Sequence, residues 1–336
     1  MSGEKFSCFQ VTKPDQEPQH AIEMLTVDQL PPGDVVIRVH WSSLNYKDAL
    51  AATAHPGVAG ELPHVPGIDA AGIVESSADA RYQPGDKVLV TGYELGAPRW
   101  GGWSEYIRVP AAWVVPLPSS LGLKESMVLG TAGFTAAQCV RELEISAIAP
   151  GSGPILVTGA SGGVGTWAVR LLSSLGYEVH AVSGKASQVD QLKSLGAQAV
   201  HGRAVLDDNP KRPLLPATWA GGVDTVGGKM LVALLKSTKV NGCISACGLV
   251  AGHQLDMTVY PFILRGVKLA GVTSSLCPRP LREEIWRRLS GPWRVDLPDE
   301  LIEEVTMQEL SAAVQRILRG EIAGRVIVRI CVENGG

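Results

Sequence analysis

The sequence predicts an α/β protein with two domains, one a mainly β, barrel-like domain and the other built on a doubly wound parallel sheet. Its 336 residues are many for one core and suit two. Turn signals divide the first third into short apolar runs, and beyond residue 150 apolar runs alternate with helical patterns. These two different sequence patterns favour two domains.

The first third of the chain is predicted to form short strands joined by tight turns. Apolar runs at residues 35–41 and 86–90 are short. Turn signals separate such runs, namely PPGD at 31–34, PG at 66–67 and PGD at 84–86. Such spacing is typical of a compact, mainly β barrel.

Two further segments complete the outline of the fold. A helical pattern runs over residues 124–144, and Pro150 and Gly151 then lead into the next strand. Near the end of the chain, residues 324–330 alternate like an edge or barrel strand. We expect this last strand to return to the first domain.

The most informative segment is the octet TGASGGVG at residues 158–165. It follows the apolar run PILV at 154–157 and precedes a helical pattern at 167–172. A strand, a glycine turn and a helix start in this order can cradle a pyrophosphate, because glycines let the backbone approach closely and the helix N-terminus offers unpaired N–H groups. The glycines read G-x-x-G-x-x-G, not the strict G-x-G-x-x-G, so a loop without a ligand is the alternative.

The segments after the octet continue the alternation of strands and helices. Strands are predicted at residues 177–182 and 197–200, and a helix between them at 188–195 is ended by Gly196. Three more apolar runs follow, at residues 222–226, 242–248 and 267–272. This pattern predicts a parallel, doubly wound sheet, which favours a dinucleotide site over a plain loop.

The end of the second strand of this sheet indicates which dinucleotide binds. NAD-binding chains usually place Asp or Glu there, about twenty residues after the glycines, to hold the ribose 2′-hydroxyl. Here the chain has Ser183, Gly184 and Lys185. A cation and a hydroxyl favour a 2′-phosphate, so we predict NADPH; the alternative is that Lys185 is an ordinary solvated lysine.

Composition excludes several classes of protein. The 30 basic and 33 acidic residues give a net charge of −3, which argues against a nucleic-acid partner. Hydrophobic content of 45% with 19% charged residues is typical of a soluble globular protein. The sequence has no stretch of eighteen apolar residues and no secretory segment at its start, so we expect a cytoplasmic protein without a membrane partner.

The cysteines and histidines do not form an evident metal site. Six cysteines are scattered along the chain without a C-x-x-C pair, so neither a disulfide framework nor a structural zinc is expected. Ligands for a catalytic zinc cannot be assembled from the sequence, and we predict no metal. Of the seven histidines, His40, His55 and His64 lie nearest the motifs, and we expect most of the seven to be surface or structural residues.

Several sequence blocks, in order from residue 35 to about 275, carry a resemblance to a known family. They are HWSSLNYKDAL (40–50), VPGIDAAG (65–72), WGG (100–102), GTAGFTA (130–136), the glycine octet, ACGL (246–249) and PFILRG (261–266), with a last match at Gly324 and Arg325. The chain resembles the medium-chain dehydrogenase/reductases of the zinc-free, quinone-oxidoreductase-like branch. Within that branch it most resembles the acryloyl-CoA reductases.

The resemblance implies a domain plan. A GroES-like β-barrel catalytic domain would span residues 1–126, and a Rossmann NADPH-binding domain residues 127–275. Residues 276–336 would return to the first domain, and the active site would lie in the cleft between the two. Relatives often pair through the edge strands of their Rossmann sheets, so the run 269–273 could build a homodimer.

The resemblance also implies a set of site residues. The catalytic candidates are Tyr46, Asn45 and Asp69, although Asn45 and Asp48 could equally cap a turn and Asp69 could be structural. Leu249 and Ile263 could equally be plain core. Lys185 stands where relatives often carry Arg, which exchanges a bidentate phosphate contact for a point charge. The cofactor-binding candidates are Tyr46, Ser161, Gly162, Gly163, Val164, Ser183, Gly184, Lys185, Arg203, Leu249, Ile263 and Ser274.

The implied reaction is NADPH-dependent reduction of the C=C bond of acryloyl-CoA to propionyl-CoA, without a metal. A hydride would reach the β-carbon, donors would meet the developing enolate oxygen, and Tyr46 or a water ordered by Asn45 or Asp69 would protonate the α-carbon. A quinone or enone/enal reductase and a non-catalytic NADPH-binding protein are the alternatives. CoA phosphates would need a basic mouth, for which Arg99, Arg279, Arg282, Arg287 and Arg288 are candidates, although a solvated helix face is the more ordinary interpretation.

Overall fold

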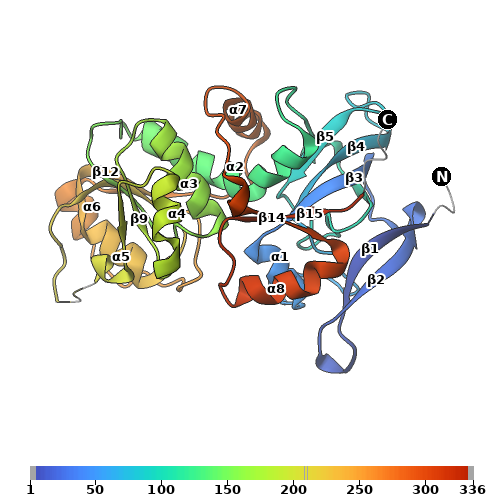
Figure 1. The fold of residues 1–336 in the computed structure, drawn as a ribbon, viewed down its shortest axis with the longest axis horizontal. Coiled ribbons are helices and arrows are strands. Elements are labelled where there is room, and N and C mark those ends of the chain that lie inside the picture. The colour runs from blue at the N-terminus through green and yellow to red at the C-terminus, as the bar shows by residue number, and fades with distance from the viewer. Residues whose placement is uncertain (1–4, 208, 210, 332–336) are drawn as a thin grey trace. The chain divides into compact units, whose positions relative to one another are not determined.

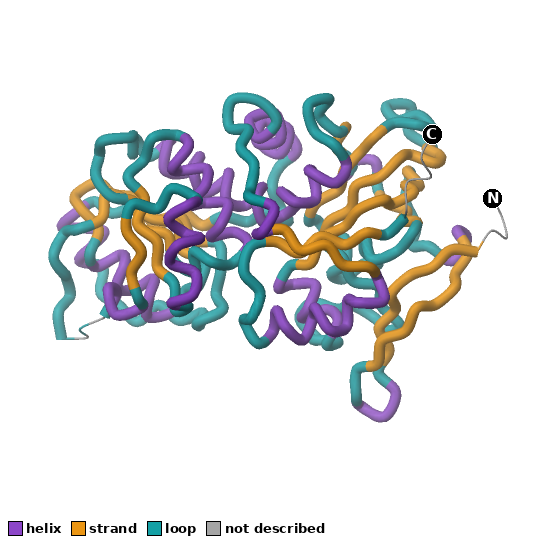
Figure 2. Tube along the Cα trace, viewed as in Figure 1, coloured by secondary structure: helices purple, strands orange, loops and turns teal. Residues whose placement is uncertain are grey.

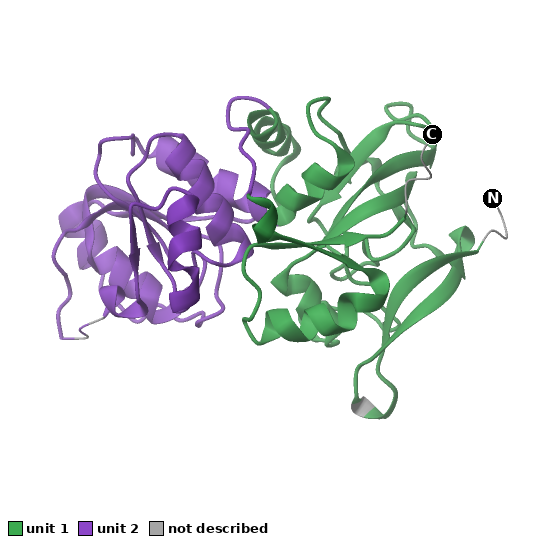
Figure 3. Ribbon diagram, in the orientation of Figure 1, with its two compact units in different colours: residues 1–131, 274–290, 298–336 green, residues 132–273, 291–297 purple. Residues whose placement is uncertain are grey.

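The computed structural model describes residues 5–207, 209 and 211–331. The chain divides into two compact units (Figure 3). Unit 1 comprises the described parts of residues 1–131, 274–290 and 298–336. Unit 2 comprises the described parts of residues 132–273 and 291–297. Within the described residues, no helix is long and apolar enough to cross a membrane.

Unit 1 is built on a seven-stranded sheet with the order β14-β15-β3-β4-β5-β7, in which β6 also pairs with β3. The central strand β3 is buried along most of its length because almost all of its residues are apolar or small. β15 is an interior strand between β14 and β3, with Val326 opposite Leu44. The sheet strands are β3 (Val35–Leu44), β4 (Asp69–Ser77), β5 (Lys87–Thr91), β6 (Tyr106–Val109), β7 (Val115–Pro116), β14 (Ile302–Thr306) and β15 (Arg325–Arg329).

A separate hairpin and three α-helices lie wholly within the described part of unit 1 (Figure 1). The hairpin strands are β1 (Lys5–Thr12) and β2 (Gln19–Thr26), which pair antiparallel. Phe9 of β1 packs its ring edge-on against Trp103 at 5.3 Å between centroids, which joins the hairpin to the core of the unit. The helices are α1 (Tyr46–Ala52), α7 (Arg279–Leu289) and α8 (Leu310–Leu318).

Unit 2 is a six-stranded parallel sheet with the order β10-β9-β8-β11-β12-β13 (Figures 1 and 2). The order in which strands are added to the sheet reverses between β8 and β11. Ligands of doubly wound folds bind at such a switch point, at the carboxyl ends of the strands. Its strands are β8 (Ile155–Val157), β9 (Val179–Val182), β10 (Ala199–His201), β11 (Trp219–Asp224), β12 (Thr238–Ala246) and β13 (Lys268–Gly271); its helices are α3 (Gly163–Ser174), α4 (Val189–Ser194), α5 (Gly228–Lys236) and α6 (Tyr260–Arg265).

The long helix α2 (Leu123–Ile145) belongs to unit 1 up to Thr131 and to unit 2 beyond it. Gly130 breaks its regularity with φ 50° and ψ −157°, a conformation that only glycine adopts without strain. Short 3₁₀ helices lie at Pro14–Gln16, Val27–Gln29, Ala111–Trp113, Ala186–Gln188, Arg203–Leu206, Asp299–Leu301 and Met307–Glu309.

Candidate functional site

The glycine turn of unit 2 joins β8 to α3. A Cβ atom on Gly165 would lie 2.3 Å from the carbonyl oxygen of Gly159, so close packing of the helix against the turn requires glycine there. Gly162, the N-cap of α3, is exposed, and a Cβ on it would meet only the Gly159 oxygen, at 3.4 Å. The N–H groups in the first turn of α3, including those of Gly163 and Val164, are therefore not covered by a side chain at position 162. This arrangement fits a pyrophosphate.

Two loops that follow the neighbouring strands meet this turn. The hydroxyl of Ser183, just after β9, donates to the hydroxyl of Ser161 at 3.4 Å, and the backbone N–H of Lys185 donates to Ser183 Oγ at 3.1 Å. A Cβ on Gly184 would lie 2.7 Å from Arg203 Nε, so the guanidinium that follows β10 covers this glycine. The loops after three adjacent strands thus bring two hydroxyls together, with the Arg203 guanidinium beside Gly184 and Lys185 next along the chain.

This cluster fits the phosphate of NADPH better than the bare ribose of NADH. Residues 183–188 carry no carboxylate that could accept from a ribose 2′-hydroxyl. Lys185 and Arg203 supply the positive charge that a 2′-phosphate requires. The assignment of these residues to a 2′-phosphate stays a prediction.

The remaining cofactor candidates lie apart from this cluster. Leu249, in the loop after β12, is 66% exposed, and Ile263 on α6 is 74% exposed, so the alternative that they are core residues is wrong. Ser274 begins the second segment of unit 1, and its carbonyl oxygen accepts from Arg282 Nη2 at 2.8 Å.

Asp69, a catalytic candidate, is a fully buried acceptor at the start of β4. Its Oδ2 accepts from Ser43 Oγ at 2.6 Å, Asn45 Nδ2 at 2.9 Å and the Thr131 N–H at 2.9 Å. Its Oδ1 accepts from Thr131 Oγ1 at 2.6 Å. The structure thus brings Asn45 and Asp69 together and ties Asp69 to the residue after the Gly130 kink.

Asn45 and Asp48 cap helix α1, which is one of the alternatives left open for them. The N–H of Asn45 donates to Asp48 Oδ2 at 2.7 Å, and the N–H groups of Gly67 and Ile68 donate to Asp48 Oδ1 at 3.1 and 2.7 Å. Burial, with the nearby Asp69 carboxylate, raises the pKa of Asp48 to about 7 against the lowering effect of these hydrogen bonds.

A buried arginine from the end of the chain balances these two carboxylates. Arg325 on β15 donates from Nη1 to Asn45 Oδ1 at 3.2 Å and from Nε to the Val128 carbonyl at 2.9 Å. Burial lowers the pKa of its guanidinium, whereas Asp69 and Asp48 act to raise it. A Cβ on Gly130 would lie 2.7 Å from Asp69 Oδ2, so the cluster fits only around a glycine. Sequence reasoning noted Arg325 only as part of a matching block; its contacts appear only in the fold.

Tyr46 differs from its neighbours because it points outward. It is the first residue of α1 and is 43% exposed. The Asn45 amide nitrogen donates inward to Ser43, Asp48 and Asp69, and its oxygen accepts from Arg325. Of the three catalytic candidates, Tyr46 alone presents a proton-donating group at the surface of unit 1.

The interpretation of the arginines on α7 as a solvated helix face is correct for some of them. Arg282 on α7 is fully buried, because its guanidinium binds backbone carbonyl groups of the same unit. Arg279 pairs with Glu283 at 2.7 Å, Arg288 pairs with Glu284 at 3.0 Å, and Arg287 is exposed. Arg279, Arg287 and Arg288 therefore belong to a solvated helix face, and Arg282 does not.

Metal ligands do not gather in the part of the chain that the structure covers: no group of three or more His, Cys, Asp and Glu side chains there could hold an ion. His64 is buried, with Nε2 3.0 Å from the Gly96 carbonyl, and burial lowers its pKa. All six cysteines are free thiols.

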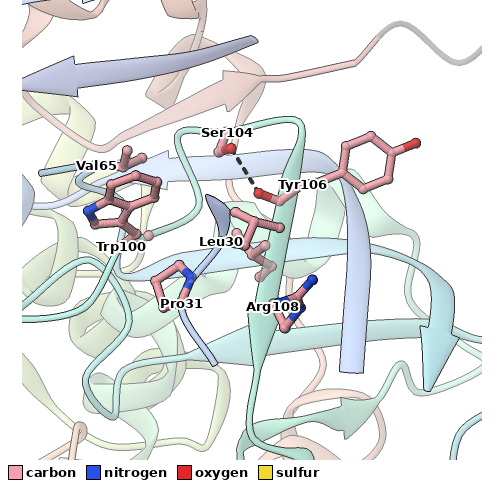
Figure 4. Close-up of a pocket in the computed structure, with 9 residues that line it drawn as sticks. Leu30, Pro31, Val65, Trp100, Ser104, Tyr106 and Arg108 are labelled. Atoms are coloured by element: carbon pink, nitrogen blue, oxygen red, sulfur yellow. Dashed lines mark hydrogen bonds between the residues drawn. The ribbon is translucent and has the colours of Figure 1, made fainter. Parts of the chain in front are cut away.

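A pocket in unit 1 is lined by none of the predicted catalytic or cofactor residues (Figure 4). Leu30, Pro31, Trp100 and Arg108 are among its lining residues, and Ser104 Oγ donates to the Tyr106 carbonyl at 2.8 Å beside it. Its volume is about 210 Å³ including the open solvent at its mouth. We assign no ligand to it.

Comparison with protein families identifies two domains. The family described as alcohol dehydrogenase GroES-like domain matches residues 31–119. The family described as zinc-binding dehydrogenase matches residues 163–290. The first match falls in unit 1, and the second begins at helix α3.

Proteins of similar sequence match over almost the whole chain. "Acrylyl-CoA reductase AcuI" of Ruegeria pomeroyi is 43% identical over 327 residues, covering 97% of this chain and 99% of that protein. "Putative quinone oxidoreductase YhfP" of Bacillus subtilis is 44% identical over 329 residues, with the same coverage.

Solved structures agree with this relationship. The YhdH oxidoreductase of Salmonella enterica in complex with NADP has a TM-score of 0.93 and 43% identity, covering 97% of this chain and 100% of that one. The structure of B. subtilis YhfP, with NAD bound, also has a TM-score of 0.93, with 44% identity and the same coverage. The chain belongs to the medium-chain dehydrogenase/reductase family.

Proposed function

We propose that this protein is an NADPH-dependent reductase that converts acryloyl-CoA to propionyl-CoA. The observation that carries the proposal is the cluster of Ser183, Lys185 and Arg203 beside the glycine turn, in a chain 43% identical to an acrylyl-CoA reductase. The cluster would provide cations for a 2′-phosphate. The substrate class is proposed from the name of the relative.

The proposed cofactor is NADPH. Similar proteins have been solved with NADP and with NAD, so the relatives alone do not decide between them. In this chain the loop after β9 offers a lysine, two serines and no carboxylate. A 2′-phosphate would be stabilised there, whereas a 2′-hydroxyl would lack its usual acceptor.

The proposed cofactor residues form two groups. One group lies in the loops after three adjacent strands, and the other would contact the nicotinamide half of the cofactor. Ser161 to Val164 would hold the pyrophosphate, and the loops after β9 and β10 would hold the 2′-phosphate and adenine end. Leu249 and Ile263 offer exposed apolar surface for a nicotinamide ring. The full proposed set is Tyr46, Ser161, Gly162, Gly163, Val164, Ser183, Gly184, Lys185, Arg203, Leu249, Ile263 and Ser274.

When bound, NADPH would supply a hydride to the β-carbon of the conjugated thioester. The π electrons of the C=C bond then move to form an enolate on the thioester oxygen, and the α-carbon takes a proton. Tyr46 is the proposed donor of that proton or of a hydrogen bond to the enolate, because its phenol is exposed. Asn45 and Asp69 are proposed to act through position, since their polar atoms are engaged inside unit 1.

A quinone or enone/enal reductase is the second candidate. The name of B. subtilis YhfP, at 44% identity, favours it. The same hydride donor and the same exposed phenol would serve a quinone, so the residues described do not separate the two acceptors. A protein that binds NADPH without turning over any acceptor is the third candidate.

We also propose a cytoplasmic homodimer with functional domains at residues 1–126 with 276–336 and at 127–275. β13 is one of the two edge strands of the described sheet of unit 2, and Leu264 on α6, just before it in the sequence, is an exposed apolar residue that a partner could cover. Light scattering of the purified protein tests the dimer; a monomeric mass at micromolar concentration would contradict it.

The test of the reaction is NADPH oxidation with acryloyl-CoA, crotonyl-CoA and a quinone, each repeated with NADH. We expect the highest kcat/KM for acryloyl-CoA with NADPH. Turnover of quinones or free enones without acryloyl-CoA would favour the second candidate. Tight NADPH binding without any turnover would favour the third.

A further inference from the structure

Arg282 makes an unusual set of contacts for a residue of an arginine-rich helix. Its Nη1 donates to the carbonyl and hydroxyl oxygens of Thr91, at 2.6 and 3.0 Å. Its Nη2 donates to the carbonyl oxygens of Ser274 and Ser275, at 2.8 and 3.4 Å. One buried guanidinium thus joins the end of β5 to the first residues of the segment 274–290.

The two residues after β5 hold the same segment from another side. The N–H of Tyr93 donates to the Ser275 carbonyl at 3.1 Å. Gly92 approaches so closely that a Cβ on it would lie 2.9 Å from the Ser275 Cα atom. Three contacts from separate residues therefore converge on Ser274 and Ser275, and we call Arg282, Gly92 and Tyr93 the clamp.

The clamp contains backbone strain. Tyr93 has φ 54°, a left-handed conformation that is uncommon and strained for a bulky residue. Strain of this kind persists where surrounding contacts over-determine the backbone, and it concentrates at functional sites. Here it accompanies the hydrogen bond from Tyr93 to Ser275.

Aromatic stacking fixes the guanidinium of Arg282. The guanidinium lies 4.2 Å from the Tyr93 ring centroid, and Tyr93 stacks on Trp113 at 5.4 Å with 4° between the planes. The guanidinium of Arg99 lies over the Trp113 ring, 5.2 Å from its centroid. The stack holds Arg282 in one orientation, which its hydrogen bonds alone would define less tightly.

We propose that Arg282 is a positioning residue that, through the clamp, holds Ser274 in place for the nicotinamide half of the cofactor. The inference rests on the proposed NADPH function, in which Ser274 lines the nicotinamide. Arg282 touches neither the cofactor nor the acceptor in this proposal. Its effect should appear in binding of the nicotinamide half and be absent from binding of the adenosine half.

The test compares two ligands on the full-length protein. NADPH has both halves, whereas adenosine 2′,5′-bisphosphate has only the half that the glycine turn, Lys185 and Arg203 would hold. For Arg282→Lys, which keeps the charge but loses the two-sided fork, we expect NADPH to bind about tenfold more weakly and the bisphosphate to bind as in the wild type. Arg279→Lys is the matched control, because Arg279 lies on the same helix and bonds to Ala112 and Val114 instead.

A second pair of variants covers the case in which Arg282→Lys fails to fold. Gly92→Ala and Gly85→Ala place the same methyl group at left-handed positions, φ 73° and 96°, on either side of β5. A Cβ on Gly85 would meet nothing within 4 Å, whereas one on Gly92 would meet Ser275. We expect only Gly92→Ala to weaken NADPH relative to the bisphosphate.

The outcomes separate this inference from the function beneath it. If the variants lose affinity for both ligands equally, or if Arg282→Lys and Gly92→Ala bind NADPH as the wild type does, the positioning role is wrong. Either result would leave the assignment of NADPH as the cofactor standing. Wild-type protein that binds neither ligand would overturn the proposed cofactor and this inference with it.

Discussion

Replacing Lys185 with alanine is the sharpest test of the predicted phosphate site. The Lys185 N–H is fixed by Ser183 Oγ at 3.1 Å, so the turn keeps its backbone contact when the side chain is shortened. Arg203 remains beside Gly184 and keeps one cation in place. The variant therefore removes one of two positive charges while the Ser183 contact and Arg203 stay in place.

The magnitude follows from the loss of one charge-assisted hydrogen bond. Such a bond contributes about 1.5–3 kcal/mol, and a value of about 2 kcal/mol corresponds to a roughly thirtyfold weaker Kd for NADPH. NADH has no 2′-phosphate, so its affinity should stay within about twofold of the wild type. Lys185→Asp adds repulsion and should raise the KM for NADPH further, with kcat at saturation changed far less.

Fluorescence titration with NADPH and NADH measures both affinities. Lys193→Ala is the matched control, because Lys193 is an exposed lysine on the following helix α4. Equal NADPH affinity in the wild type and in Lys185→Ala would refute the assignment of the 2′-phosphate to this turn. Equal losses of NADPH and NADH would indicate instead a general distortion of the site.

Three further variants test the packing beneath the site. Gly165→Ala, whose methyl would lie 2.3 Å from the Gly159 oxygen, should weaken NADPH by at least about tenfold in the same titration, and unchanged affinity would contradict the turn geometry. Gly130→Ala, at φ 50° and 2.7 Å from Asp69 Oδ2, should lower the free energy of unfolding in urea by about 2 kcal/mol or more, and an unchanged value would contradict the close fit. The pKa of Asp48 is raised from 3.8 to about 7, so the folded protein holds a proton that the unfolded chain has released in this window, and stability falls as the pH rises through it. Asp48→Asn should remove that part of the slope in thermal unfolding midpoints at pH 5, 6 and 7, and an identical slope would contradict the shift.

Local patterns in the sequence predicted the parallel sheet well. The glycine octet follows β8 and continues into the first turn of α3, and the helix expected at 188–195 contains α4, with Gly196 at φ 105° beyond it. These features depend on residues close in sequence, so periodicity and turn chemistry are sufficient to find them. The third strand is β10 (Ala199–His201), slightly later than the predicted run, because a short apolar run defines its ends poorly.

Contacts between distant segments could not be predicted in the same way. Asn45 and Arg325 are 280 residues apart, and their contact depends on β15 lying beside β3 in the sheet. Arg282 looks like part of a solvated helix face, since arginines surround it, yet the fold buries it on Thr91 and Ser274. A charged residue is expected at the surface unless partners are known, and these partners come from elsewhere in the chain.

The most direct test of the proposed reaction follows deuterium into the product. The protein is incubated with acryloyl-CoA and NADPH carrying deuterium at the transferable C4 position, and the product is analysed by mass spectrometry and NMR; a parallel reaction uses ordinary NADPH in D₂O. We predict propionyl-CoA with one cofactor deuterium on the β-carbon in the first reaction and one solvent deuterium on the α-carbon in the second. Cofactor deuterium on the α-carbon, or no propionyl-CoA while a quinone is reduced, would contradict the proposed function.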